Sequence, residues 1–437
     1  MDGLVQFAQQ VVSGTAIGCV YALVALGFVL IYKATEVVNF AQGELMMVGA
    51  FLAYTFIVIL GMGFWLGALL ALLGTALLGG ALDRVVMRPM VGQPVWGVPV
   101  RNGMVMAVEE INTAGGIHGR QLKLVVEDSG YDPKKAVLAT QKLLNRDEIF
   151  VMAGAMGTPT VLASMPLVLR QGLAHVFPLT AAKQMYEPFD KLKFALFAPY
   201  YHAMRAGTKW MVENHGKTRV CALYQDDEFG LNGHRGVVAQ LEAMGMALVE
   251  TTTYKRGATD FSSQIARLRA AECDLVTLQS VIRETVGSMA EARKIGWDVD
   301  FLVNQAGYAP EVVMLGKEVV EGLYAMGMTP IPDYDSASTD VQAWMDRYRE
   351  RFDADANIQA VAGYQVIQLT ALGMQNAGPD LSTDSFVAGL EKIQGYTDMF
   401  GAAPASFGPE RRLAAETVFV NRVEGGRWVQ LTEPIGF

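Results

Sequence analysis

The chain has 437 residues and carries 35 Lys and Arg against 44 Asp and Glu, a net charge of −9. Seven of these charges precede residue 97, so the remainder holds 32 basic and 40 acidic side chains. This balance supplies no basic stripe for phosphate groups, which argues against nucleic acid as a partner. The segment from 97 to 437 is longer than one hydrophobic core usually holds, so we expect two lobes there.

The first part of the chain is apolar. No charged residue occurs from 9 to 32 or from 45 to 82. A bilayer crossing needs roughly 20 apolar helical residues, so we predict about three transmembrane helices, at 11–32, 45–60 and 64–82. A cleaved signal peptide is the alternative, but the charged start is missing and the apolar stretches are too long and too many.

Three cysteines are present. Cys19 falls in the first predicted span, whereas Cys221 and Cys273 each fall in a predicted buried strand. A disulfide can form only between the last two. We expect a reduced, hydrophobic role for both, because paired strands of one sheet would carry them.

After residue 97, helical and extended patterns alternate, which is typical of parallel sheets with crossover helices. Helices are predicted at 103–113, 133–144, 201–214, 233–244, 261–271, 284–295 and 339–352. Strands are predicted at 121–127, 149–153, 174–178, 219–224, 248–254, 275–279 and 301–304. Asp132 is the expected N-cap of the second helix. The predicted fold class is α/β with two Rossmann-like lobes.

A small, hydroxyl-rich turn at 154–160 follows the predicted strand 149–153. Ligands of open α/β sheets collect at the carboxyl ends of strands. This turn is therefore a candidate binding loop.

Two stretches carry a family resemblance: VPVRNGMVMAVEEINTAGGIHGR at 98–120 and VEDSGYDPKKAV at 126–137. They resemble the leucine/isoleucine/valine-binding protein family of type I periplasmic receptors, and the similarity runs to the C-terminus. The resemblance implies a solute-binding domain over 97–437. Lobe 1 would hold about 97–198 and 328–400, and lobe 2 about 199–327 and 401–437, closing together on one small molecule.

The N-terminal part carries a second resemblance. YALVALGFVLIYKATEVVNFAQGE at 21–44 and RPMVGQP at 88–94 are similar to the start of the branched-chain amino acid permease of the same ABC importers. About the first third of a permease is covered. The fragment 1–96 lacks the later spans and the loop that grips the ATPase, so we expect an anchor rather than a pathway. The implied partners are a permease and, through it, ATPase subunits.

The receptor resemblance is itself incomplete. The family opens with an apolar strand and a loop before the helix that begins here near Val100. Residues 84–96 either replace that strand or form the permease's own loop after its third span, and both readings stay open.

The ligand residues are carried over position by position. Gly157 and Thr158 fall where the family binds the ligand carboxylate, and Thr180 and Ala181 where it supplies further backbone and hydroxyl contacts. Glycine permits close approach, and hydroxyl and N–H groups satisfy an anion without a full charge. The alternative is that Thr158 and Thr180 only cap the helices that follow.

Two departures bear on the ligand. Gln305 stands where amino-acid-binding members place a carboxylate for the ligand's ammonium, and Phe229 stands where they place a tyrosine. A buried ammonium needs a charged partner, so an uncharged amide or an organic or aromatic carboxylate gains over an α-amino acid. Arg283 either supplies charge from lobe 2 or is a solvated helix start, and Tyr308 either stacks on the ligand or packs in the core.

Residue patterns for catalysis are scarce. The five histidines show no metal-ligand spacing, and no Gly-x-Ser-x-Gly elbow occurs. The acidic triplet 226–228 lacks the alternating ligands of a calcium loop, so an exposed acidic loop is expected. We therefore expect neither an enzyme nor a cofactor.

The charges beside the predicted spans conflict with the membrane side expected for the receptor domain. Lys33, Arg84 and Arg88 would share one membrane face, which the positive-inside rule assigns to the cytoplasm. The expected location is the bacterial inner membrane with the receptor domain in the periplasm, and these charges oppose it. Three interpretations stand: the solute-binding component of an ABC importer, a membrane-tethered sensor, and a non-functional fusion of permease and receptor genes.

Overall fold

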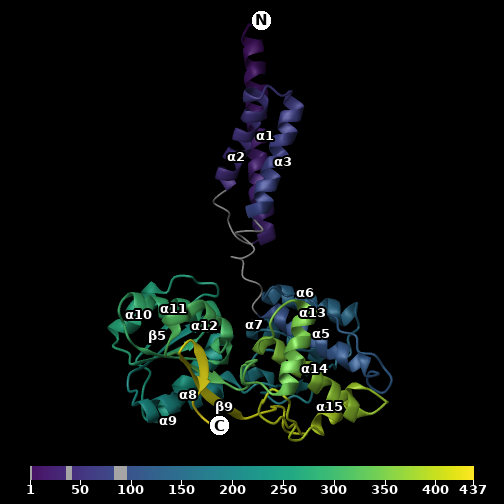
Figure 1. The fold of residues 1–437 in the computed structure, drawn as a ribbon, viewed down its shortest axis with the longest axis vertical. Coiled ribbons are helices and arrows are strands. Elements are labelled where there is room, and N and C mark those ends of the chain that lie inside the picture. Colours follow the sequence, from purple (N-terminus) through teal and green to yellow (C-terminus); the bar gives the residue numbers. More distant parts are fainter. Residues whose placement is uncertain (1, 36–41, 83–95) are drawn as a thin grey trace. The chain divides into compact units, whose positions relative to one another are not determined.

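The structure is a computed structural model that describes residues 2–35, 42–82 and 96–437. It contains two compact units, Met1–Pro94 and Val95–Phe437 (Figure 1). The strand-like role considered for residues 84–95 lies outside the described residues. Each unit is treated by itself below.

The first unit is helical where it is described. It comprises α1 (Asp2–Thr35), α2 (Gln42–Tyr54), a π-helical turn η1 (Thr55–Ile59) and α3 (Phe64–Leu82). Helix α3 packs closely against the π-helical turn at Gly67. A Cβ atom added to this glycine would lie only 2.5 Å from Cγ1 of Ile57, so no larger residue fits there. Within the described residues, one segment, Phe64–Ala81, is long and apolar enough to cross a membrane. Helix α3 matches the predicted range 64–82, whereas α1 extends beyond 11–32 at both ends and the predicted 45–60 is divided between α2 and the π-helical turn. The number of spans stays a prediction.

Lobe 1 of the second unit is built on a small parallel sheet of order β1-β2-β3. Its strands are β1 (Met152–Ala153), β2 (His175–Val176) and β3 (Lys193–Phe194), and its helices are α5 (Gly97–Thr113), α6 (Pro133–Asn145), α7 (Thr158–Arg170), α13 (Thr339–Phe352), α14 (Ile358–Ala377) and α15 (Thr383–Glu391), with a 3₁₀ turn η3 (Lys183–Met185). The predicted N-cap is confirmed, since the Asp132 carboxylate accepts from two backbone N–H groups of α6. A core around Trp344 and Phe177 fills this lobe.

Lobe 2 holds a larger sheet of order β5-β4-β6-β7-β8-β9-β10, parallel from β5 to β8. Its strands are β4 (Val220–Gln225), β5 (Glu250–Tyr254), β6 (Leu275–Gln279), β7 (Asp300–Val303), β8 (Tyr324–Gly327), β9 (Thr417–Glu424), β10 (Arg427–Gln430) and β11 (Ile435–Gly436). Its helices are α8 (Tyr200–His215), α9 (Glu228–Ala243), α10 (Ser262–Ala270), α11 (Ile282–Lys294) and α12 (Pro310–Gly316), with 3₁₀ turns η4 (Gln305–Gly307) and η5 (Lys317–Val320). The helix-strand alternation predicted from the sequence is confirmed here.

The predicted strand 121–127 is wrong, because no strand is assigned between α5 and α6. A strand exists only where a neighbour completes its backbone hydrogen bonds. The Leu122 backbone bonds instead to the side-chain amide of Asn112, at 2.7 and 2.9 Å. The predicted strand 149–153 is likewise shortened to Met152–Ala153.

The expected reduced state of Cys221 and Cys273 is also wrong. The two residues form a disulfide, with Cα atoms 5.9 Å apart. Cys221 lies on β4, but Cys273 lies in the turn before β6 rather than in a strand. That turn brings its Cα within the separation that a disulfide spans.

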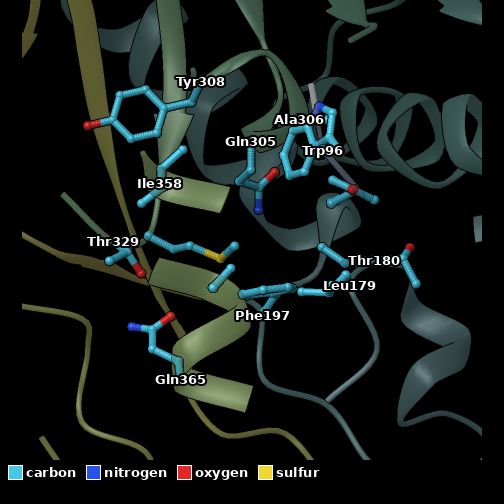
Figure 2. A pocket seen from close by; sticks show the side chains of 14 residues that line it. Trp96, Leu179, Thr180, Phe197, Gln305, Ala306, Tyr308, Thr329, Ile358 and Gln365 are labelled. Carbon is cyan, nitrogen blue, oxygen red and sulfur yellow. The ribbon is translucent and has the colours of Figure 1, made fainter. Parts of the chain in front are cut away.

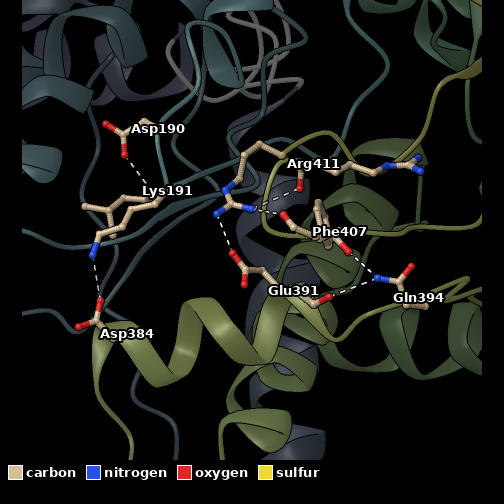
Figure 3. A network of polar contacts seen from close by, with 10 residues as sticks. Asp190, Lys191, Asp384, Glu391, Gln394, Phe407 and Arg411 are labelled. Atoms are coloured by element: carbon tan, nitrogen blue, oxygen red, sulfur yellow. Dashed lines mark hydrogen bonds and ion pairs between the residues drawn. The ribbon is translucent and has the colours of Figure 1, made fainter.

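An ion pair between a buried arginine and a partly exposed glutamate joins a late segment of the chain to lobe 1. Arg412, whose side chain is 2% exposed, donates to Glu391 at the end of α15, with a nitrogen–oxygen distance of 2.8 Å. Its guanidinium also lies 4.5 Å from the ring centroid of Phe194. Figure 3 shows Glu391 and Gln394 facing the segment that carries Phe407 and Arg411. Phe407 and Ala414 belong to the lobe 1 core, although the predicted division assigned residues after 400 to lobe 2.

We expect Arg412→Ala to destabilise the protein by about 2–3 kcal/mol, because it removes the buried guanidinium and its hydrogen bonds to Glu391 and the Gly408 carbonyl. Urea unfolding of the full chain, followed by tryptophan fluorescence, measures this loss. Arg351→Ala is the matched control, since Arg351 pairs with Glu109 at an exposed site. Equal urea midpoints of unfolding for the two variants would show that the Arg412–Glu391 pair contributes no more to stability than an exposed pair does.

His175 introduces a pH dependence. It lies on β2 and is 1% exposed. Burial, with a smaller contribution from the Lys193 charge, lowers the pKa of His175 from 6.5 to about 4. The folded state therefore keeps the imidazole neutral where the unfolded chain would take up a proton.

We predict that this histidine destabilises the fold as pH falls from 6.5 to about 4, and that its contribution is constant above 6.5. The loss amounts to about 3 kcal/mol at the lower limit, at 1.36 kcal/mol per pKa unit. His175→Gln should be less pH-sensitive than the parent over this window in urea titrations at fixed pH steps. Parallel pH profiles for both proteins would contradict the assignment.

Candidate functional site

A pocket lies between the two lobes, with an empty volume of about 610 Å³ that includes its open mouth. Lobe 1 contributes Leu179, Thr180, Ala181 and Phe197, together with Ile358 and Gln365 of α14, and lobe 2 contributes Tyr200, Gln305, Ala306 and Tyr308. Figure 2 shows the labelled lining residues, among them Gln305, Phe197 and Ile358, arranged around the pocket on several elements. This is the size and position expected of a small-molecule site between domains.

The pocket is aromatic and uncharged. Trp96, Phe197, Tyr200 and Tyr308 line it, and none of the described lining residues carries a charge. Burial raises the pKa of the Tyr200 phenol to about 12 and also raises the pKa of Tyr308. Both phenols are therefore neutral at physiological pH.

Gln305 supplies the distinctive polar group. It opens the 3₁₀ turn after β7, and the preceding Asn304 caps that turn by accepting from the Ala306 N–H. Its Nε2 donates to the Ala198 carbonyl at 2.9 Å, which fixes the amide plane. Its Oε1 is buried without a hydrogen-bond partner. A buried acceptor left unpaired costs free energy, so this oxygen is prepared to accept a ligand N–H.

The two threonines carried over from the family lie together. Thr158 Oγ1 and Thr180 Oγ1 are 2.6 Å apart, and both residues are buried. Thr158 makes no side-chain cap to α7, whose N-cap is Gly157. Thr180 lines the pocket, whereas Thr158 does not.

Gly157 is covered by an aromatic ring. Its φ is +87°, and a Cβ there would lie 2.3 Å from Cε2 of Tyr131. Only glycine fits between this ring and the turn. The ring occupies the space in front of Gly157, so this predicted residue does not line the pocket.

Of the predicted site residues, the structure brings Thr180, Ala181, Gln305 and Tyr308 together around one cavity. Phe229 lies outside the lining, packed edge-on against Tyr200 with ring centroids 5.2 Å apart. Arg283 is exposed at the start of α11. It therefore fits the solvated helix start that the sequence analysis left open.

Several lining residues escaped sequence reasoning. Trp96 was assigned to the membrane fragment, yet it lines the pocket directly before α5. Phe197 and Gln365 lie on a loop and on a buried helix, where side-chain periodicity gives no sign of a ligand. Only their position beside the carboxyl ends of the strands marks them, and that position requires the fold.

Polar contacts join the lobes around the pocket. Gln184 of lobe 1 donates to Glu228 of lobe 2 at 3.0 Å, and Asn357 donates to Glu311 at 2.9 Å. The Arg256 guanidinium donates to the Tyr131 carbonyl and lies 4.5 Å from the centroid of that ring. These contacts connect the two lobes beside the pocket. In the described ranges, no group of three or more His, Cys, Asp or Glu is placed to hold a metal ion.

Two family models match the chain. Residues 90–427 match the periplasmic binding protein family. Residues 10–115 match the permease component of branched-chain amino acid transport systems. Both resemblances noted in the sequence are thereby confirmed.

Curated relatives are similar over the second unit. The leucine-, isoleucine-, valine-, threonine- and alanine-binding protein of Pseudomonas aeruginosa is 24% identical over 71% of this chain and 83% of its own length. The Leu/Ile/Val/Thr-binding protein of Salmonella typhimurium is 24% identical over 51% of this chain. This chain covers 60% of that relative.

Solved structures share the fold. A substrate-binding periplasmic protein of Ralstonia solanacearum is 23% identical, with a TM-score of 0.70 over 78% of this chain and 97% of its own. A branched-chain amino acid ABC transporter protein of Thermus thermophilus with bound valine is 15% identical, with a TM-score of 0.71 over 78% and 92%. A fatty acid ABC transporter substrate-binding protein of Thermomonospora curvata is 20% identical, with a TM-score of 0.70 over 78% and 88%.

The two-lobe α/β architecture, the pocket between the lobes and the match over 90–427 lead to one assignment. The chain belongs to the periplasmic binding protein family, with an N-terminal part that is similar to a branched-chain amino acid permease.

Proposed function

We propose that the chain is the solute-binding component of an ABC importer and holds one small molecule between its lobes. Family membership and the pocket between the lobes support this function. A permease and its ATPase subunits would be the partners. The permease-like fragment would act as the anchor that brings the receptor to the membrane, with α3 as a membrane-spanning helix.

The buried, unpaired Oε1 of Gln305 carries the proposal on ligand class. A ligand with an uncharged N–H can donate to this oxygen without bringing a charge into the pocket. An ammonium group would lose its hydration shell and find only a neutral amide as its partner, which costs free energy. The aromatic lining suits a flat or branched apolar body. A small amide therefore fits this oxygen better than a branched-chain amino acid does. An organic or aromatic carboxylate has no N–H for Gln305, so its oxygens would have to meet the Thr180 hydroxyl instead. The carboxylate and the branched-chain amino acid are retained as alternatives.

The ligand class is tested by a thermal-shift screen of the full chain in detergent against leucine, valine, benzamide, isobutyramide and benzoate. A ligand at 100 times its Kd should add about 2.7 kcal/mol of stability. We expect the amides or benzoate to raise the melting temperature, and leucine to do so only in Gln305→Glu, where a carboxylate meets the ammonium. Gln141→Glu, an exposed change on α6, is the matched control.

Two outcomes separate the parts of this proposal. Stabilisation of the parent by leucine but by no amide would reject the uncharged ligand and leave the receptor function intact. A lack of response to all five compounds would count against solute binding at this pocket.

We further propose that the receptor unit resides on the extracytoplasmic side. The disulfide between Cys221 and Cys273 supports this side, because such bonds persist in oxidising compartments. The positive-inside rule applied to Lys33, Arg84 and Arg88 favours the other side. A charge excess this small is outweighed by a buried covalent bond.

We expect the two thiols to resist alkylation by a maleimide in intact cells and in denatured extracts, and to react only after reduction. Cys19→Ser supplies the background without the free cysteine. The number of alkylated thiols, counted by the mass shift of the full chain before and after dithiothreitol, is the measurement. Two reactive thiols before reduction would place the receptor unit in the cytoplasm.

A further inference from the structure

A second cavity lies within lobe 1 and shares no lining residue with the pocket between the lobes. Its walls include two runs of consecutive residues, 120–125 and 147–153, and its empty volume is about 1330 Å³ with open solvent included. A wall made of consecutive residues presents backbone as well as side chains. We call this cavity the strand groove.

Among the described residues, part of the backbone on each wall of the strand groove makes no backbone–backbone hydrogen bond. Within the described part of the chain, none of residues 123–127 makes a backbone–backbone hydrogen bond. On the other wall, Met152 and Gly154 donate to β2 at 3.0 and 3.1 Å. Alternate residues of a parallel strand bond to opposite neighbours. The N–H and C=O groups of Val151 and Ala153 therefore face away from β2, toward the groove.

The other surfaces of the strand groove are apolar. Val108 of α5 and Ile367 and Met374 of α14 come from the main lobe 1 core. Leu143 of α6 and Met152 come from a separate hydrophobic cluster. An occupant is thus enclosed by aliphatic side chains from two clusters, as is a central strand of a parallel sheet, which reads as a continuous apolar run.

A carboxylate with one buried oxygen lies at one end of the strand groove. Asp147 lines it at the start of the second run, and its Oδ2 is buried without a partner. A strand that continues the parallel order of β1, β2 and β3 would enter with its amino end beside Asp147. A cationic side chain at that end would pair with this carboxylate.

We propose that the strand groove binds an extended apolar segment of another polypeptide, about five residues long and led by a cationic residue. Its backbone pairs with residues 123–127 on one side and with Val151 and Ala153 on the other. Its aliphatic side chains fill both faces, and its leading cation meets Asp147. Such strand addition takes affinity from main-chain hydrogen bonds and selectivity from the side-chain surfaces.

The test uses the full chain in detergent and a fluorescent peptide, Lys-Val-Ile-Val-Ala-Val, with binding followed by anisotropy. We expect saturable binding, and protection of the amides of 123–127 and 149–153 in hydrogen exchange. N-methylation of alternate peptide amides keeps the side chains but removes donors, and should weaken binding at least about tenfold, or 1.4 kcal/mol. Asp147→Asn should weaken the lysine peptide several-fold and leave a glutamine-led analogue unchanged, with Asp335→Asn as the exposed control.

Three results would overturn the proposal. Equal binding of the N-methylated peptide would reveal unspecific apolar association. Protection of the same amides without peptide, independent of protein concentration, would assign the groove to residues 83–95 of the same chain. Protection that increases with protein concentration would assign it to a second copy.

Discussion

Backbone pairing is the constraint on which the architecture depends. In lobe 2, β4 is hydrogen-bonded on both sides by β5 and β6, and β7 lies between β6 and β8, so the central strands have no free edge. This pairing fixes the carboxyl end of β7, where Gln305 follows. One hydrogen bond from the Gln305 amide to the Ala198 carbonyl then orients the side chain. In lobe 1 the same requirement is met only from β1 to β3, and the segment before α6 stays irregular although its residues alternate like a strand.

This contrast explains where sequence reasoning succeeded. Strand 275–279 and helix 339–352 were predicted to the residue, because their local pattern agrees with their surroundings. Helix α14 was not predicted, since it is buried on nearly every side and shows no amphipathic period. Segment 121–127 has the residue pattern of a strand but no described neighbouring strand. Whether a neighbour is present depends on tertiary structure, which a short stretch of sequence does not reveal.

The predicted site residues also fall into two groups, those that line the pocket and those that do not. Position-by-position transfer from the family located Thr180, Ala181, Gln305 and Tyr308, which follow strand ends and line one pocket. It placed Gly157 and Phe229 at the ligand as well, although Tyr131 covers the first and Tyr200 stands in front of the second. Their contact with a ligand stays a prediction, and in both places the neighbouring aromatic ring comes from another segment of the chain. The disulfide was missed for a related reason, since Cys273 lies in a turn whose position depends on strand pairing.

The two family matches overlap over residues 90–115, and packing decides to which unit α5 belongs. A Cβ on Gly103 would lie 2.0 Å from the Ala360 carbonyl oxygen, and one on Gly363 would lie 2.1 Å from the Val100 carbonyl oxygen. These reciprocal close approaches join α5 to α14 backbone to backbone, which no side chain on either glycine would permit. On its outer face α5 presents Glu109 and Glu110, which pair with Arg351 and Arg347 of α13. Helix α5 thus packs as a structural part of the receptor unit, although its sequence lies within both family matches.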